Sequence, residues 1–182
     1  MPDLKQSLLE LIKQRAILRG QFVLKSGKTS SYYIDMRLVT LSAAAAAVIG
    51  ELMLEVVERE RIDAVGGPSI GADPIVGSTL ALAGQRGLPL AGFLVRSAVK
   101  EHGTQKLLEG PLKTGHRVLL VEDTVTTGGS LLKAAEEVGK VGAQVVLLLP
   151  LVDRLQGARE AASAANLRFH PLFTIRDLGL AD

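Results

Sequence analysis

Two adjacent carboxylates, Glu122 and Asp123, follow directly on the apolar segment 118–121. Ionised carboxylates only accept hydrogen bonds, so this pair suits the neighbouring hydroxyls of a ribose, contacted directly or through hydrated magnesium. The next residues, 124–130, are rich in hydroxyls and glycine and lead into a pattern of helical period. Backbone N–H groups and hydroxyls at the start of a helix bind phosphate, and Gly128 and Gly129 let the backbone approach it closely. The segment 118–130 therefore predicts a site for a phosphorylated ribose.

Other readings of this segment fit less well. The two acids alone are compatible with an ordinary polar strand end, but the whole array favours a site. A Walker-type nucleotide loop requires Gly-Lys-Ser/Thr at the start of the helix, which is absent. No serine or cysteine lies on an elbow-like turn with a partner histidine, so Asp123 is not interpreted as a triad member.

The composition excludes several classes of protein. The chain has 182 residues, of which 47% are hydrophobic and 22% charged, as in one ordinary globular domain. It has no cysteine, which excludes disulfides and thiolate metal sites and suits a reducing cytoplasm. Its net charge of +2 comes without a basic run, so no nucleic-acid partner is expected. The apolar runs are strand-length and the N-terminal region is amphipathic, so neither a membrane span nor a signal peptide is expected.

Apolar strands alternate with helical patterns from residue 62 onward. Helices are expected after Asp3, through 43–57, at 73–83 with Asp73 as N-cap, at 130–140 and at 157–165. Strands are expected at 62–65, 90–95, 117–121, 144–149 and 168–175. This order predicts a parallel sheet with helices on both faces and ligands beyond the carboxyl ends of its strands. The polar segment 22–37 is interpreted as a small irregular or hairpin-like lid, and 96–116 as a long functional or mobile loop.

Four segments, in order along the chain, resemble a known family. Residues 118–130 resemble the phosphoribosyl-pyrophosphate motif of the type I phosphoribosyltransferases. Residues 24–37, which include Tyr33-Ile34-Asp35, resemble the hood signature of the orotate phosphoribosyltransferases; 96–103 resemble their mobile catalytic loop and 152–154 their orotate-contacting segment. The resemblance implies an α/β fold with a type I phosphoribosyltransferase-like parallel sheet, helices on both faces and a small N-terminal hood. It describes 1–182 as a single domain, with the hood mainly at 18–40 and the mobile loop at 96–116.

The resemblance also implies an activity. Ribose 5-phosphate would pass from 5-phosphoribosyl 1-pyrophosphate to orotate, giving orotidine 5'-phosphate and pyrophosphate, in de novo pyrimidine (UMP) biosynthesis. Magnesium would be held mainly through the substrate, near Glu122 and Asp123. The enzyme would be a cytoplasmic homodimer in which the catalytic loop of one subunit acts in the site of the other.

Roles for individual residues follow from the same resemblance. The catalytic residues would be Glu122, Asp123, Lys100 and His102. Phosphoribosyl pyrophosphate would be bound by Lys25, by Ser69, Ile70, Gly71 and Ala72, by Arg96, Ser97, Lys100 and His102, and by Glu122, Asp123, Thr124, Val125, Thr126, Thr127, Gly128, Gly129 and Ser130. Orotate would be bound by Tyr33, Ile34, Thr126 and Arg154. An anionic planar ring matches a flat aromatic surface and a bidentate guanidinium.

Two positions depart from the family pattern. The family usually has Arg-Lys where this chain has Arg96-Ser97, and many members carry a lysine where this chain has Gly71. Both departures remove positive charge from the pyrophosphate site, so they bear on the affinity for that substrate more than on the reaction.

Two rival functions remain. A phosphoribosyltransferase for a purine or uracil would share the acidic array but not the hood and Arg154. A regulatory protein that senses phosphoribosyl pyrophosphate and binds nucleic acid would need a basic stripe or an added domain.

Overall fold

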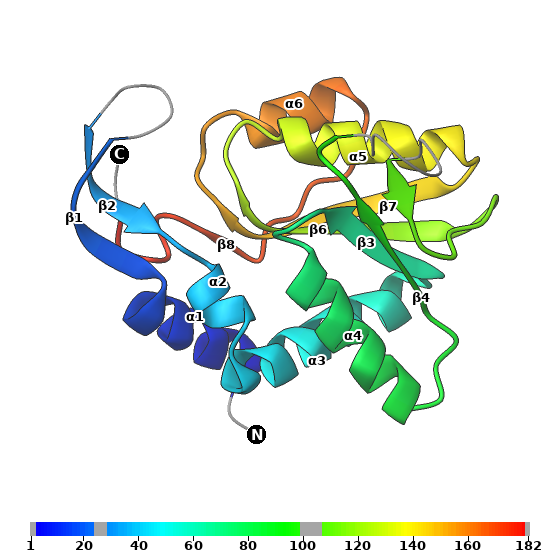
Figure 1. The fold of residues 1–182 in the computed structure, drawn as a ribbon, viewed down its shortest axis with the longest axis horizontal. Helices are drawn as coiled ribbons and strands as arrows, with labels where there is room; N and C mark the ends of the chain where they lie inside the picture. Colours follow the sequence, from blue (N-terminus) through cyan, green and yellow to red (C-terminus); the bar gives the residue numbers. More distant parts are fainter. Residues whose placement is uncertain (1–2, 24–28, 99–106, 181–182) are drawn as a thin grey trace.

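A computed structural model of the chain describes residues 3–23, 29–98 and 107–180. Within these residues a central six-stranded sheet has the order β5-β4-β3-β6-β7-β8 (Figure 1). Its strands are β3 (Ala64–Pro68), β4 (Ala91–Val95), β5 (Leu108–Glu109), β6 (Arg117–Val125), β7 (Gln144–Asp153) and β8 (Phe173–Thr174). All neighbouring strands are parallel except β5, which pairs with β4 in antiparallel fashion at the edge. The predicted α/β fold with a mostly parallel sheet is confirmed.

Helices cover both faces of this sheet (Figure 1). One face carries α1 (Leu4–Arg15), α2 (Arg37–Thr40), α3 (Ala43–Glu60) and α4 (Asp73–Gln85), and the other carries α5 (Gly129–Lys140) and α6 (Ala158–Ala164). As predicted, Asp3 caps α1, because its carboxylate accepts hydrogen bonds from the main-chain N–H groups of Lys5 and Gln6. The prediction of Asp73 as the N-cap of α4 is wrong. Ala72 occupies that position, and Asp73 is the first helical residue.

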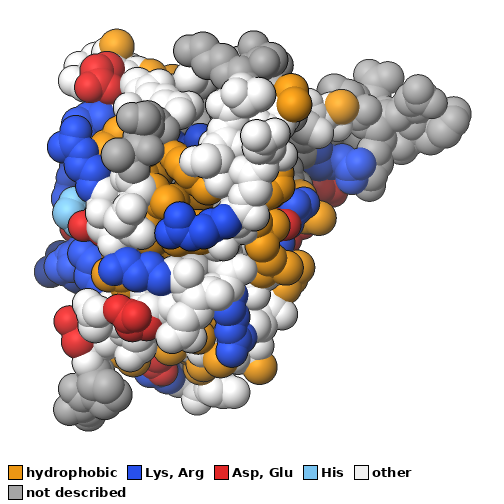
Figure 2. Space-filling model, turned by 90° about the vertical axis from the view of Figure 1, so that its left-hand side faces the viewer, with side chains coloured by type: hydrophobic (Ala, Val, Ile, Leu, Met, Phe, Trp, Pro, Cys, Tyr) orange, Lys and Arg blue, Asp and Glu red, His pale blue; other side chains and the backbone are white. Residues whose placement is uncertain are grey.

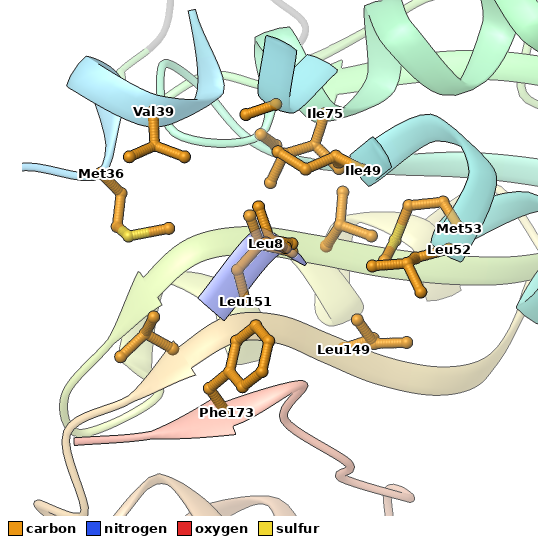
Figure 3. Close-up of a cluster of buried hydrophobic side chains, with 14 of the residues drawn as sticks. Leu8, Met36, Val39, Ile49, Leu52, Met53, Ile75, Leu149, Leu151 and Phe173 are labelled. Atoms are coloured by element: carbon orange, nitrogen blue, oxygen red, sulfur yellow. The ribbon is translucent and has the colours of Figure 1, made fainter. Parts of the chain in front are cut away.

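The alternation of side chains along the strands divides the core into two layers. On β6, Leu119 and Val121 pack toward α1–α4, whereas Val118 and Leu120 pack toward α5 and α6. Figure 3 shows the first layer, where Leu8 of α1 and helix residues such as Ile49 lie over Leu149 and Leu151 of β7; the complete set labelled there is Leu8, Met36, Val39, Ile49, Leu52, Met53, Ile75, Leu149, Leu151 and Phe173. Burial on both faces explains why these strands read as continuous apolar runs.

The largest differences in length from the prediction concern three strands. β6 and β7 continue past their apolar runs, because Glu122 pairs with Pro150 and Thr124 with Val152 through the main chain. Glu122 and Asp123 therefore lie inside a strand, not in the loop after it. The last predicted strand, 168–175, is reduced to β8 and an isolated bridge between Leu148 and Phe169. Main-chain pairing does not depend on apolar side chains, so the hydrophobic pattern alone misplaced these ends.

The predicted lid is an antiparallel hairpin of β1 (Ile17–Val23) and β2 (Thr29–Ile34), set to one side of the central sheet (Figure 1). Figure 2 looks onto this side of the molecule, where Lys and Arg side chains are interspersed with uncharged, apolar and acidic ones. No helix formed by the described residues combines the length and apolar character needed to cross a bilayer.

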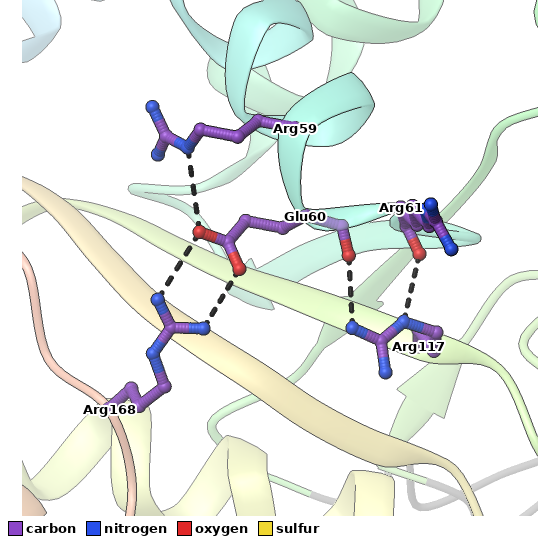
Figure 4. Close-up of polar contacts among 5 residues, drawn as sticks. All are labelled: Arg59, Glu60, Arg61, Arg117 and Arg168. Carbon is purple, nitrogen blue, oxygen red and sulfur yellow. Dashed lines mark hydrogen bonds and ion pairs between the residues drawn. The ribbon is translucent and has the colours of Figure 1, made fainter.

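Figure 4 shows the contacts that hold the carboxyl end of α3 beside Arg117, the first residue of β6. The guanidinium of Arg117, at the start of β6, donates to the carbonyls of Glu60 and Arg61, both at 3.0 Å. Arg168 makes two hydrogen bonds, of 2.8 and 3.2 Å, to the Glu60 carboxylate. These contacts satisfy terminal carbonyls of the helix and hold it against β6 and the segment before β8.

Candidate active site at the carboxyl end of the sheet

The two acids lie at the carboxyl end of β6, the central strand between β3 and β7. Burial, followed by the charge of Asp123, raises the pKa of Glu122 to about 8. Burial also raises the pKa of Asp123, while the N–H of Thr124, which donates to its Oδ1 at 2.6 Å, and the charge of Arg37 act in the opposite direction. Burial therefore disfavours two negative charges at this pair. Hydroxyl donors or a cation would compensate for them, as in many ligand sites with carboxylates of perturbed pKa.

Gly71 lies directly against Asp123. A Cβ atom added at position 71 would be 2.7 Å from Oδ1 of Asp123 and 3.0 Å from its Cγ. The Thr124 N–H donates to the same carboxylate oxygen, so a shift of Asp123 would disturb this hydrogen bond. The lysine that many family members carry at this position would displace Asp123 from its position here. In this chain, a side chain at position 71 and the present position of Asp123 are therefore not compatible.

The loop 69–72 connects β3 to α4 beside this acid. The hydroxyl of Ser69 donates to both carboxylate oxygens of Asp73, each at 2.8 Å. The Ile70 side chain is 66% exposed, while Ala72 is buried under the loop. The structure thus presents Ser69, Ile70 and Gly71 at the same edge of the sheet as Glu122 and Asp123, as the strand order requires.

The loop after β6 turns into α5 through Gly128, whose φ of 83° lies in the left-handed region. Thr127, Gly129 and Ser130 are exposed, whereas Val125 is buried and Thr126 half-buried. No side chain of the N-cap residue caps the first turn of α5, so the N–H groups of this turn are left for other hydrogen-bond acceptors. This arrangement can bind a phosphate group.

A pocket of about 290 Å³ opens between this turn and the loop after β3. It is lined by Pro68 and Ser69, by residues 95–97 at the end of β4, and by Gly129, Ser130 and Lys133 of α5. Sequence reasoning placed Ser69, Arg96, Ser97 and Ser130 in one site but missed Lys133. The signal was its spacing: Lys133 follows Ser130 by three residues, which places both on the same side of a helix.

Arg154 follows β7 and lies beside the end of β6, because its main-chain N–H donates to the carbonyl of Val125 at 2.9 Å. Its Nε atom is buried and has no hydrogen-bond partner among the described residues. Thr126 is the next residue of the adjacent chain segment. The structure therefore brings together two of the four residues predicted to bind orotate.

The other two predicted orotate residues lie on the hood. Tyr33 is 40% exposed and packs against Phe22, with ring centroids 5.8 Å apart, whereas the side chain of Ile34 is buried in the core. Arg37 makes a two-bond ion pair with Asp35, at 2.8 and 3.1 Å. Because the charges of Arg37 and Asp35 both influence the pKa of Asp123, this end of the hood lies within electrostatic range of the acids. Lys25, Lys100 and His102, also predicted for the site, lie outside the described residues.

Similar proteins agree with this geometry. Residues 40–167 match the phosphoribosyl transferase domain family. The orotate phosphoribosyltransferase of Rhodopirellula baltica is 45% identical over 179 residues, which cover 95% of this chain and 93% of that protein. The crystal structure of Mycobacterium tuberculosis H37Rv orotate phosphoribosyltransferase in complex with Fe(III) dicitrate has a TM-score of 0.85 at 41% identity. The match covers 98% of this chain and 100% of the chain in that structure. The complex of that enzyme with 5-phospho-alpha-D-ribosyl 1-diphosphate has a TM-score of 0.81 at 39% identity, with coverages of 98% and 100%. The chain therefore belongs to the phosphoribosyl transferase domain family and, within it, to the orotate phosphoribosyltransferases.

Proposed function

We propose that this chain transfers ribose 5-phosphate from phosphoribosyl pyrophosphate to orotate. The observation that carries the proposal is the position of Glu122 and Asp123. They lie half-buried in β6, beside the 69–72 loop on one side and at the head of the turn into α5 on the other. A pyrophosphate, a ribose hydroxyl pair and a 5-phosphate would be arranged in this order along the carboxyl end of the sheet. Membership of the orotate phosphoribosyltransferases supports the choice of reaction.

The residues supply binding, orientation and charge rather than a nucleophile. Breaking the bond to pyrophosphate develops positive charge on the ribose and negative charge on the leaving group. Glu122 and Asp123 accept hydrogen bonds from the ribose hydroxyls and lie near the developing positive charge. N–H groups of the first turn of α5 hold the 5-phosphate, and those of Ser69 to Ala72 hold the pyrophosphate.

The donor set fits magnesium that is bound mainly through the substrate. The two acids offer oxygen ligands, which magnesium prefers, and it is commonly held by one or two carboxylates together with substrate phosphates. Within the described residues no group of three or more His, Cys, Asp or Glu side chains could enclose a metal by itself. When bound, the ion would neutralise charge on the departing pyrophosphate. Glu122 and Asp123 are the residues that would hold it.

Orotate is expected to lie between the hood and the end of β7. Arg154, with its buried and unpartnered Nε, can pair with the carboxylate of the base, and the exposed ring of Tyr33 offers a flat surface. Thr126 follows Val125, whose carbonyl accepts a hydrogen bond from the Arg154 N–H, so its hydroxyl is a further candidate contact for the base.

Five features stay predictions: magnesium, the homodimer, the catalytic loop acting in the neighbouring site, the single domain over 1–182 and the cytoplasmic location.

The activity is tested by following orotate absorbance in the ultraviolet after addition of phosphoribosyl pyrophosphate and magnesium. We expect the absorbance to fall only when all three are present, and Asp123→Asn to lower the turnover number on the order of 10²-fold. Adenine and uracil serve as competing bases in the same assay. Consumption of phosphoribosyl pyrophosphate with either of them, and not with orotate, would replace the proposed base.

The role of Arg154 gives a prediction about base selection. Arg154→Ala removes the partner of the orotate carboxylate, so the KM for orotate should rise by about ten- to a hundredfold, since a hydrogen bond to a charged group is worth roughly 1.5–3 kcal/mol. The KM for phosphoribosyl pyrophosphate should stay close to that of the unaltered chain. An equal rise in both constants would show that Arg154 supports the fold of the strand end instead of selecting the base.

A further inference from the structure

Lys133 extends from α5 across the pocket toward the end of β4. Its Nζ atom donates a hydrogen bond to the main-chain carbonyl of Ser97 at 3.2 Å. Ser97 follows Arg96, which lines the same pocket. The ammonium group therefore lies beside the position at which the family pattern has a lysine and this chain has a serine.

The charges around the pocket are one-sided. Among the described residues that line it, Arg96 and Lys133 carry charge and none is Asp or Glu. Lys133 makes no ion pair with a carboxylate in the described part of the chain, unlike Lys140 at the other end of α5, which pairs with Glu137. A neutral carbonyl is a modest partner for an ammonium group, and a phosphate oxygen is a stronger one because the hydrogen bond then joins opposite charges. The pocket is therefore built to receive an anion.

The remaining lining shows which anion fits. Ser69 begins the loop proposed to hold pyrophosphate, and Lys133 contacts the carbonyl of Ser97, beside Arg96. Gly129 and Ser130 belong to the turn proposed to hold the 5-phosphate, so Lys133 lies on the pyrophosphate side of the pocket. Lysine acts as a compact point charge on a long flexible stem and is a common phosphate ligand. We infer that Lys133 binds the pyrophosphate group of phosphoribosyl pyrophosphate and supplies the positive charge that Ser97 does not. This inference rests on the proposed function and adds a binding residue to it.

The origin of the charge matters for the mechanism. Lys133 is anchored in a helix of the same subunit as Glu122 and Asp123, whereas Lys100 and His102 are predicted to reach the site from the neighbour. A cation on α5 is therefore present in the site independently of any partner subunit. Because the Lys133 side chain is exposed, salt screens part of this attraction.

Lys133→Met tests the inference, with Lys140→Met as the matched control on the same helix. We expect the KM for phosphoribosyl pyrophosphate to rise about tenfold or more in Lys133→Met, since one charge-assisted contact is lost. The KM for orotate should not change, and the difference should shrink in high salt. Calorimetry with magnesium and inorganic pyrophosphate should show the same weakening. Lys140→Met should behave like the unaltered chain in each measurement.

A rescue experiment separates charge from structure. Ser97→Lys added to Lys133→Met places a cation at the neighbouring position, so the KM for phosphoribosyl pyrophosphate should return toward its original value. Lys133→Arg keeps the charge, so it should retain most of the affinity for phosphoribosyl pyrophosphate. Unchanged pyrophosphate affinity in Lys133→Met, or equal weakening of orotate, would overturn the inference. If the unaltered chain consumes no orotate, the proposed function fails, and pyrophosphate calorimetry on the two variants still decides the role of Lys133.

Discussion

At the level of single residues, the carboxyl group of Glu122 links the candidate site to the stability of the fold. Its pKa is raised from 4.5 to about 8 in the folded chain, first by burial and then by the charge of Asp123. The folded state thus binds this proton more tightly than the unfolded state. The resulting stability is complete below about pH 4.5 and is lost as the pH rises toward 8.

Glu122→Gln should remove this loss, because the amide stays neutral at every pH in the range. Without magnesium or substrate, the variant should unfold at a higher temperature than the unaltered chain at pH 8, and at nearly the same temperature near pH 4.5. Glu55→Gln, on the exposed surface of α3, is the control. Thermal unfolding followed by circular dichroism measures both. Parallel pH curves for Glu122→Gln and the unaltered chain would contradict the prediction.

Gly71 gives a second prediction at this scale. Gly71→Ala places a Cβ atom 2.7 Å from Oδ1 of Asp123, so the carboxylate must move. A displacement of about 1 Å can cost on the order of 10²-fold in rate, so the turnover number should fall at least tenfold. Gly77→Ala is the matched control, because nothing lies within 4 Å of its added Cβ and alanine suits the interior of α4. Full activity in Gly71→Ala would mean that Asp123 can act from another position.

At the level of elements, two arginines hold the carboxyl end of α3, and we expect them to contribute unequally to the free energy of unfolding. Arg117 donates to two main-chain carbonyls of the helix end, one of them part-buried, whereas the Arg168 side chain that pairs with Glu60 is 62% exposed. Arg117→Met should lower the free energy of unfolding in urea by about 1–2 kcal/mol. Arg168→Met should lower it by less than Arg117→Met does, as is usual for an exposed ion pair. A larger loss of stability in Arg168→Met than in Arg117→Met would show that the ion pair with the Glu60 carboxylate is the main contact.

At the level of the whole molecule, the predicted exchange of catalytic loops has a quantitative consequence. If Lys100 acts in the site of the partner, Lys100→Ala and Asp123→Asn damage each site from different subunits. A mixed dimer of the two variants then contains one doubly altered site and one intact site. Random pairing of equal amounts makes half of the dimers mixed, so about a quarter of the original activity should return in a two-fold symmetric dimer.

Subunit exchange must be demonstrated separately, for example by native mass spectrometry of tagged variants. Activity that stays at the level of the separate variants after exchange would place Lys100 in the site of its own subunit.

The sequence by itself determined the features that depend on local rules. Asp3 as a helix cap, the alternation of strands and helices, and the acid pair before a hydroxyl- and glycine-rich turn all follow from short-range spacing. The ends of β6 and β7 did not, because polar residues such as Glu122 join a strand through main-chain pairing with a neighbour that the local pattern does not show.

Only the tertiary structure decided which distant residues meet. Gly71 lies against Asp123 because β3 and β6 are neighbours in the sheet, and Arg154 meets Val125 because β7 follows β6 on the other side. Lys133 meets Ser97 because α5 packs over the carboxyl ends of β3 and β4. The physical reason is the same in each case: residue type and spacing specify what a side chain can bind, but strand order and helix packing specify what lies beside it.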